Sequence, residues 1–191
     1  MIATADMAAI SLELLPPLSM PPRDEHAQAK SWTVWAPRTD LLADCAAGAS
    51  RAIRLTSRGD SAVLSSLRHR CPVSPGQTYR FSVRFRPEGL TSIRDSVRPL
   101  LRWFRASGQC AATDYVVRVA AEPDGWYRAD QVVGPHPDAI EVEVHLMLRW
   151  TAQGSVTWAQ PSLRACAAPA TRHATLGVAN VGVALDAPVE E

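Results

Sequence analysis

The amino-acid sequence predicts an all-β protein, an antiparallel β-sandwich of about eight or nine strands. Three observations support this fold class. Apolar and polar residues alternate strictly in several short segments, most clearly from Glu141 to Trp150. Turn signals rich in Gly, Pro and Asp recur about every ten to fifteen residues. Between them, no segment has the apolar spacing typical of an amphipathic helix.

Residues 1–30 are predicted to form an N-terminal extension and a proline-rich linker. Residues 6–15 fit two alternatives, a short amphipathic helix capped by Asp6 or an edge strand from Ser11 to Leu15. The run PPLSMPP follows, and it is predicted to be stiff and extended because proline fixes φ and lacks an N–H donor. We expect the sandwich domain to span residues 31–166.

The first strands are predicted between residues 32 and 67. Trp32 and Val34 share one face, so Trp35 points the other way and must be covered or functional. A loop rich in Ala and Gly is expected from 40 to 50. Alternation returns at 53–56, the RGD at 58–60 makes a turn, and residues 63–67 continue as a strand.

Strands in the middle of the chain follow the Pro75-Gly76 turn signal. The predicted inward residues of the next strand are Tyr79, Phe81, Val83 and Phe85. Residues 97–105 form another strand, with Leu101 and Trp103 on one face. After a turn at Ser107-Gly108, the inward residues are predicted to be Tyr115, Val117 and Val119. A turn at 123–125 then precedes Trp126 and Tyr127, which must point to opposite faces if extended.

The segment from Glu141 to Leu163 is predicted to be a β-hairpin, with residues 151–154 as its connection. Its buried face is predicted to hold Val142, Val144, Leu146, Leu148 and Trp150. Its solvent face is predicted to hold Glu141, Glu143, His145 and Arg149, with Met147 as the one apolar exception. By alternation, the aromatic residues predicted to lie in the core are Trp150, Trp158, Tyr79 and Tyr115.

Composition fits one folded domain with tails, because 47% of the residues are hydrophobic and 20% are charged. The net charge of +1 gives no whole-chain argument for nucleic acid. Eight arginines between Arg80 and Arg118 face only three acidic residues. A solvated strand face is the preferred interpretation of this cluster, and an anion-binding patch is the alternative.

The N-terminus lacks the positive region of a signal peptide, and no segment is apolar over a membrane-spanning length. We therefore expect a cytoplasmic protein without a membrane partner. The four cysteines show no paired CxxC spacing, so no metal site is predicted, and reduced thiols are favoured over disulfides. No cofactor is predicted.

Several motifs in order resemble the galactose-binding-like jelly roll of carbohydrate-binding modules. The motifs are SWTVWAPR, RAIRLTSRG, VSPGQTYRFSVRFRP, LRWF, GWYR and PDAIEVEVHLMLRWTAQGSVTWAQPSLR, over about residues 31–165. The resemblance implies a jelly-roll sandwich whose ligand is a carbohydrate. Ala159-Gln160 stands where members with structural calcium often carry an acidic pair, so the resemblance does not imply calcium here.

The tail ACAAPATRHATLGVANVGVAL resembles the join between such a jelly roll and a carbon–nitrogen hydrolase of the nitrilase superfamily. This resemblance implies an N-terminal ancillary domain, with residues 167–191 as a linker and the start of a truncated downstream domain. The partners it suggests are the downstream hydrolase domain or a second copy in a homodimer.

The sequence argues against an enzyme within these residues. A nitrilase-type site needs Cys, Lys and Glu in one pocket, and the only lysine, Lys30, precedes the predicted sandwich. No G-x-S-x-G motif is present. His145 on the outer strand face and His136 between two prolines are interpreted as surface or loop histidines.

Carbohydrate binding remains, and it requires exposed aromatic rings on which sugars stack, with polar groups nearby. The candidate ligand-binding residues are Trp35, Trp103, Trp126, Tyr127, Arg102 and Arg128. The predicted function is a non-catalytic, carbohydrate-binding-like ancillary module. One alternative is a structural or interaction domain attached to a carbon–nitrogen hydrolase. The other is an anionic-ligand or nucleic-acid binder using the arginine cluster, with nucleic acid the less favoured partner.

Overall fold

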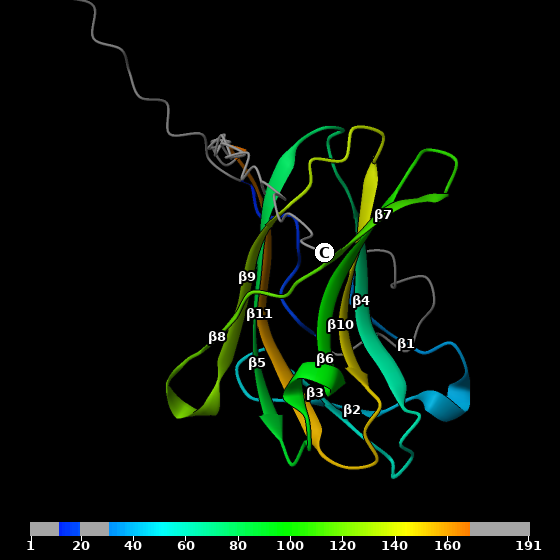
Figure 1. Ribbon diagram of the computed structural model, residues 1–191, viewed down its shortest axis with the longest axis vertical. Helices are drawn as coiled ribbons and strands as arrows, with labels where there is room; N and C mark the ends of the chain where they lie inside the picture. The colour runs from blue at the N-terminus through cyan, green and yellow to red at the C-terminus, as the bar shows by residue number, and fades with distance from the viewer. Residues whose placement is uncertain (1–11, 20–30, 169–191) are drawn as a thin grey trace, which may run out of the picture.

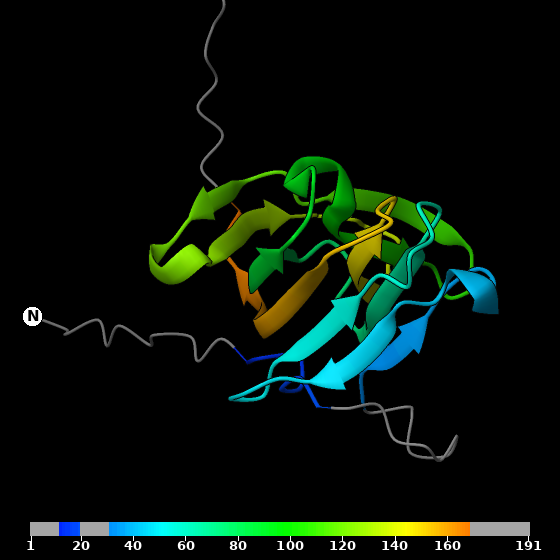
Figure 2. The same ribbon diagram turned by 90° about the horizontal axis from the view of Figure 1, so that it is seen from below.

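The computed structural model describes residues 12–19 and 31–168 of the chain. Two antiparallel β-sheets pack against each other as a sandwich, which confirms the predicted fold class (Figure 1). Figure 2 shows from below how β2 and β3, in blue and cyan, extend one sheet beside β11, in orange. Predictions for residues 1–11, 20–30 and 169–191 lie outside the described residues.

The first sheet has five strands in the order β1-β4-β10-β6-β7. Their bounds are β1 Thr33–Trp35, β4 Leu64–Pro72, β10 Glu141–Arg149, β6 Val97–Phe104 and β7 Cys110–Tyr115. Strand β10 lies at the centre and pairs along most of its length with β4 and β6. On each face of the sheet, the side chains of β10 therefore lie between side chains of β4 and β6.

The second sheet has six strands in the order β2-β3-β11-β5-β9-β8. Their bounds are β2 Asp44–Ala47, β3 Ile53–Thr56, β11 Ser155–Cys166, β5 Thr78–Glu88, β9 Tyr127–Val133 and β8 Val119–Ala121. Short helical turns connect strands at η2 Thr39–Leu41, α1 Ile93–Ser96 and η3 Pro123–Gly125. The four inward residues predicted for β5 are all buried.

Eleven strands are present in the described residues, against the eight or nine expected. Strand β2 lies in the segment predicted as a loop, because Ala-rich sequence gives no alternation to detect. The chain around Tyr115 forms two strands, β7 and β8, which belong to different sheets.

Strands β10 and β11 do not form the predicted hairpin. Strand β10 pairs with β4 and β6, whereas β11 pairs with β3 and β5 in the other sheet. The connection at 150–154 therefore crosses from one sheet to the other. Trp150 adopts a left-handed φ of 54°, which ends the alternation and turns the chain out of β10. As a result Trp150 is 59% exposed and is not a core residue as predicted.

The inward assignment of Tyr115, Val117 and Val119 is also wrong, because all three are exposed. Asp114 takes the inward position at the end of β7. Its carboxylate accepts hydrogen bonds from Trp103 Nε1 at 3.0 Å and from the Gly134 N–H at 3.2 Å, and lies 2.9 Å from His136 Nε2. These partners compensate the partial burial of the Asp114 side chain, and the inward position of Asp114 leaves Tyr115 on the outer face.

The core between the sheets contains large aromatic side chains from both layers. Trp103 of β6 lies 6.0 Å from Tyr79 of β5, and Trp158 of β11 lies 5.4 Å from Phe85, measured between ring centroids. Trp158 and Tyr79 are buried, as predicted. Contacts of this kind add to the burial of apolar area that holds two sheets together.

Residues 12–19 pack against the sandwich. Leu15 and Leu18 are 4% and 2% exposed, and the indole N–H of Trp32 donates to the Pro16 carbonyl at 3.1 Å. Glu13 forms an isolated bridge with Arg164 of β11, and its carboxylate accepts from the Leu163 N–H at 2.7 Å. This segment therefore contributes side chains to the core of the sandwich.

Candidate functional site

The six predicted ligand-binding residues do not lie together. Trp35 and Arg102 are on the outward face of the five-stranded sheet, as the strand registers show. Trp126 and Arg128 lie on the outward side of the six-stranded sheet, beside Arg84. Trp103 and Tyr127 face the interior. A platform made of all six is therefore not formed.

Trp103 is a core residue and not a stacking platform. It is 1% exposed, its Nε1 donates to Asp114, and its ring centroid lies 4.7 Å from that of His136. Tyr127 is half-buried and stacks on Phe85, with ring centroids 5.4 Å apart. Neither ring presents a free face on the surface of a sheet.

The outward side of the six-stranded sheet, here the β5 face, carries ion-paired arginines. The pairs are Arg54–Glu88, Arg86–Glu88, Arg84–Glu122, Arg128–Glu122, Arg80–Asp130 and Arg164–Glu13. Arg84 and Arg86 also lie over the indole of Trp126, at 5.0 and 5.6 Å from the ring centroid. Each of these six arginines is already ion-paired, so this face is the weaker candidate for a binding site.

The outward side of the five-stranded sheet, here the β10 face, is different. Its residues come from all five strands and form rows of cross-strand neighbours. One row contains Trp35, Ser66 and Met147, and the next contains Arg68, His145, Leu100 and Tyr115. A third row contains Arg70, Glu143, Arg102 and Thr113. Five arginines (68, 70, 98, 102 and 149) face only two glutamates, Glu141 and Glu143. The arginine cluster of the sequence is therefore divided between two faces, and Arg98 and Arg102, which form no ion pair within the described residues, lie on this one.

The centre of the β10 face is a hydrogen-bonded chain of three side chains. His145 Nε2 lies 2.7 Å from Glu143 Oε1, and His145 Nδ1 lies 3.2 Å from the Ser66 hydroxyl. An ionised carboxylate only accepts, so Nε2 is the donor to Glu143. Glu143 and His145 are 8% and 3% exposed, which corrects the prediction that both are solvent-facing.

Charges around Glu143 keep it ionised. The hydrogen bond from His145 lowers the pKa of Glu143 below its ordinary value, against the opposing effect of burial, and the charges of Arg68 and Arg102 lower it further. Within residues 12–19 and 31–168, neither arginine forms an ion pair of its own. The centre of the face thus holds a fixed carboxylate between two cationic groups that have donors to spare.

Aromatic side chains border this polar centre. Trp35 on edge strand β1 packs edge-on against His145 at 5.9 Å, and Arg68 lies 5.7 Å from the Trp35 ring centroid. Tyr115, at the end of the opposite edge strand β7, is 54% exposed. Trp150 follows β10, and the guanidinium of Arg149 stacks on it at 3.8 Å. Four strand spacings make the sheet about 19 Å wide.

The chain Ser66–His145–Glu143 has the connectivity of a hydrolase triad but not its setting. Ser66 is 0% exposed and lies within β4, between the neighbouring strands β1 and β10. A nucleophile needs access to substrate and free N–H donors for the developing oxyanion. The backbone around Ser66 lies in a sheet, paired on both sides, and the buried hydroxyl has no access, so this arrangement supports structure and not acyl transfer.

Two of the cysteine thiols are also unsuited to act as nucleophiles. Burial raises the pKa of the Cys45 thiol to about 11 and that of Cys71 to about 12, the latter with a contribution from Glu13 and Glu141. Both thiols are therefore protonated near neutral pH. All four cysteines are free. The part of the chain that the structure describes contains no group of three or more His, Cys, Asp or Glu side chains placed to hold a metal ion.

Of the six predicted ligand-binding residues, Trp35 and Arg102 lie on the β10 face. The prediction did not include Arg68, Glu143, His145 or Tyr115, which lie on the same face. The alternation in EVEVHLML placed Glu143 and His145 on the outward side correctly. The sequence does not show that β10 is the central strand of its sheet. In that position, side chains from both neighbouring strands cover the outward residues of β10. The one local indication of burial is that His145 lies between apolar residues in a strand without turn signals.

No protein-family model matches the chain, and no curated protein matches it significantly. Solved structures do match in fold. A tandem of two CBM22 modules from Paenibacillus barcinonensis Xyn10C gives a TM-score of 0.54 at 13% identity, over 86% of this chain and 49% of that chain. The present chain therefore spans about half the length of that tandem.

Two enzyme structures match as well. A Stig cyclase from Fischerella sp. TAU gives a TM-score of 0.53 at 11% identity, over 83% of this chain and 100% of that chain. The enzymatically active domain of bacteriophage CBA120 tailspike protein 4 gives 0.53 at 12% identity, over 71% of this chain and 19% of that chain.

Identities this low show a shared fold alone. Described residues include no helix long and apolar enough to cross a membrane. The predicted attachment to a carbon–nitrogen hydrolase stays a prediction, because most of the tail that resembles one lies outside the described residues. The chain is thus similar to carbohydrate-binding modules, and also to two enzyme structures, in the architecture of its β-sandwich.

Proposed function

We propose that the chain is a non-catalytic carbohydrate-binding module whose ligand lies across the β10 face. The observation that carries this proposal is the arrangement of Trp35 and Tyr115 on opposite edges of a sheet whose centre is polar. Aromatic rings suit the C–H faces of sugars, and fixed carboxylate, imidazole and guanidinium groups suit their hydroxyls. The CBM22 tandem of the same fold supports the ligand class.

The charge of the β10 face points to acidic glycans as the ligand class. Arg68 and Arg102 flank Glu143, and the arginines of this face outnumber its glutamates. Guanidinium groups bind carboxylates through paired hydrogen bonds, so uronic acid residues complement this face better than neutral sugars do. The arginines of the β5 face are less available to a ligand, because each of them already pairs with an acidic side chain.

Affinity electrophoresis through gels that contain polygalacturonate, alginate, xylan or hydroxyethylcellulose tests the proposal. We expect the acidic polysaccharides to retard the chain most. Trp35→Ala and Tyr115→Ala should each weaken binding about tenfold or more, because the loss of one stacking ring removes a main contact. Trp126→Ala on the β5 face is the matched aromatic control and should bind as the unmodified chain does.

Retardation that Trp126→Ala abolishes, or that neither Trp35→Ala nor Tyr115→Ala changes, would place the site elsewhere. A folded chain that binds none of the four polysaccharides would favour the structural or interaction role. A single-stranded oligonucleotide bound with steep salt dependence, in the absence of polygalacturonate binding, would favour the anionic-ligand alternative, because phosphate contacts release counterions.

A further inference from the structure

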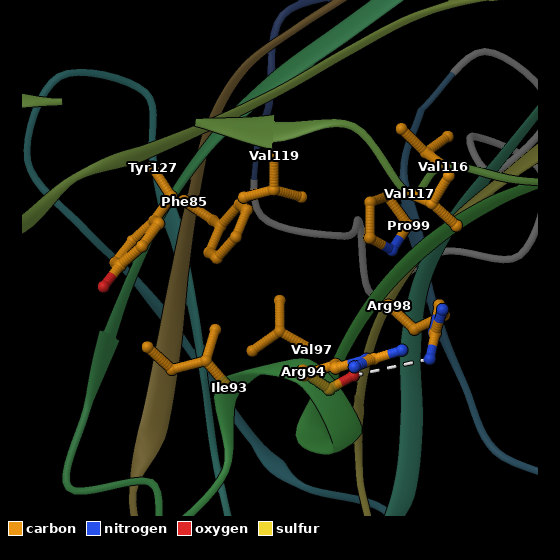
Figure 3. A pocket seen from close by; sticks show the side chains of 10 residues that line it. All are labelled: Phe85, Ile93, Arg94, Val97, Arg98, Pro99, Val116, Val117, Val119 and Tyr127. Carbon is orange, nitrogen blue, oxygen red and sulfur yellow. Dashed lines mark hydrogen bonds between the residues drawn. The ribbon is translucent and has the colours of Figure 1, made fainter. Parts of the chain in front are cut away.

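A pocket of about 400 Å³ lies between the two sheets, under the segment at 116–118 that links β7 to β8 (Figure 3). Its volume falls in the range of small-molecule sites, about 300–1,000 Å³. The walls are mainly apolar. Phe85 and Tyr127 come from the six-stranded sheet, Val97 from the five-stranded sheet, and Val119 from β8.

Two arginines lie together at one end of this pocket. Figure 3 shows Arg94 and Arg98 side by side, away from the rings of Phe85 and Tyr127. Among the residues that the structure describes, neither arginine forms an ion pair. Arg98 Nη2 donates a long hydrogen bond of 3.4 Å to the Arg94 carbonyl, and its Nε is buried with no partner. A buried N–H donor without an acceptor is energetically costly, and the Arg98 Nε is such a donor.

A further arginine near Arg98 adds positive charge to this region, which favours the binding of an anion. Burial lowers the pKa of nearby Arg149, and the positive charge of Arg98 lowers it further, while Asp95 and Tyr115 act in the opposite direction. The Asp95 carboxylate accepts a hydrogen bond from the Ser92 hydroxyl at 2.7 Å. Arg94 and Arg98 are the two charged residues that line the pocket, and no acidic residue lines it. An apolar cavity with a cationic end complements a ligand with an apolar body and a negative head group.

We propose that this pocket binds a small amphipathic carboxylate, with its alkyl or aryl body against Phe85, Val97, Val119 and Tyr127 and its carboxylate between Arg94 and Arg98. The site shares Arg98 with the β10 face, but its apolar walls lie between the sheets, and it does not depend on carbohydrate binding at that face. A planar carboxylate can accept hydrogen bonds from the terminal nitrogens of both guanidinium groups. Arg94 is exposed, so it lies at the entrance through which such a ligand would pass.

Isothermal titration calorimetry with sodium decanoate tests this proposal, with decylamine and 1-decanol as head-group controls. We expect decanoate to bind with one site per chain and at least about tenfold more tightly than decylamine, because only the anion complements the arginines. Arg94→Gln and Arg98→Gln should each weaken decanoate binding about three- to tenfold. Arg118→Gln removes the same charge from an exposed arginine that does not line this pocket, and it should leave binding unchanged.

Arg94 is exposed, so Arg94→Gln should fold normally even if Arg98→Gln does not, and circular dichroism melting checks both. Val119→Trp fills the pocket from an exposed strand position and should abolish binding. Three results would overturn the proposal. These are no decanoate binding by the folded chain, equal binding of the three head groups, or decanoate binding that Arg94→Gln and Val119→Trp leave unaltered. Polysaccharide retardation by Arg94→Gln and Val119→Trp should be unaffected, because neither residue belongs to the β10 face, and this separates the two sites.

Discussion

Glu143 and His145 are the residues on which the β10 face depends. A carboxylate and an imidazole are buried there as a hydrogen-bonded pair, with Ser66 completing the chain and Arg68 and Arg102 supplying positive charge. Buried polar groups are tolerated when their hydrogen bonds are satisfied and become costly when one partner is removed. This pair therefore both orders the face and makes it sensitive to substitution.

Glu143→Gln should lower the free energy of unfolding at pH 7 by about 1–3 kcal/mol, because a buried charge-assisted hydrogen bond is weakened. The pKa of Glu143 is depressed below its ordinary 4.5 in the folded chain. Its ionised form therefore adds stability above about pH 4.5, and that stability is lost as the pH falls through the lower folded pKa. Urea unfolding at several pH values should show the difference between the two proteins shrinking below pH 4.5.

Glu141→Gln is the matched control on the same face of β10. The Glu141 side chain is 39% exposed and pairs with Arg70 at 2.6 Å, so its removal should cost at most about 0.5 kcal/mol. Two results would show that Glu143 is not held as an ionised group. One is an equal decrease in the free energy of unfolding for both variants at pH 7, and the other is a decrease for Glu143→Gln that does not change with pH.

Alternation identified which residues share a face, but it did not reveal burial or the partners across strands. Alternation puts Glu143 and His145 on the correct side of the strand but predicts that both are exposed, because the side chains that cover a central strand come from elsewhere in the sequence. Tyr115 was placed inside because the pattern Tyr-Val-Val-Arg-Val looks amphipathic. The inward burial of Asp114, which depends on Trp103 and His136, has no signature in the local sequence.

At the scale of elements, the connection between β10 and β11 decides the topology. A short polar segment between two alternating strands fits a hairpin and a crossing between sheets equally well, so sequence identified the two strands and not their pairing. The crossing ends in a close approach of two backbones. A Cβ on Gly154 would lie 2.6 Å from the Gly89 carbonyl oxygen and 2.7 Å from that of Glu88, and Gly154 has a φ of +91°.

Gly154→Ala should therefore destabilise the chain by about 3 kcal/mol or more, since a steric clash with backbone adds to the cost of a left-handed φ. Gly76→Ala is the control, because Gly76 also has a positive φ of +72° but its Cβ would meet open space. It should cost only about 1–2 kcal/mol. The midpoint of chemical unfolding measures both. Similar losses would mean that Gly89 and Gly154 do not approach as described.

At the scale of the whole molecule, the folded unit includes residues that precede the predicted sandwich domain. Residues 1–30 were predicted as an extension and linker, yet the described part of that region places Leu15 and Leu18 in the core and Glu13 against β11. Short segments without periodicity give no sequence signal for packing of this kind. The proline-rich run holds Leu18 between two pairs of prolines, which made it look like a spacer.

Leu18→Ala should lower the free energy of unfolding by about 2–4 kcal/mol, the usual cost of truncating a buried leucine. Leu12→Ala is the control in the same segment, because Leu12 is 73% exposed and should lose less than about 0.5 kcal/mol. Thermal and urea unfolding compare the two. A negligible effect of Leu18→Ala would show that residues 12–19 are not part of the stable sandwich.

The two outward faces of the sandwich differ in how far their arginines are ion-paired, and this contrast is the basis of the proposed function. Arginines of the β5 face are paired and cover Trp126, whereas the β10 face has unpaired arginines around Glu143 and aromatic residues at its edges. Sequence could predict an arginine-rich sandwich with unexplained aromatics. It could not divide those residues between faces, because the division depends on which strands share a sheet.

NMR spectra of the six tryptophan indole N–H groups during titration with tetragalacturonate test the carbohydrate site most directly. If the ligand binds across the β10 face, the Trp35 signal shifts with saturation, while the signals of Trp126 on the β5 face and of buried Trp158 stay in place. Trp35→Phe assigns the signal. Shifts confined to Trp126, or no shift with tetragalacturonate and with neutral xylotetraose, would contradict carbohydrate binding at the β10 face.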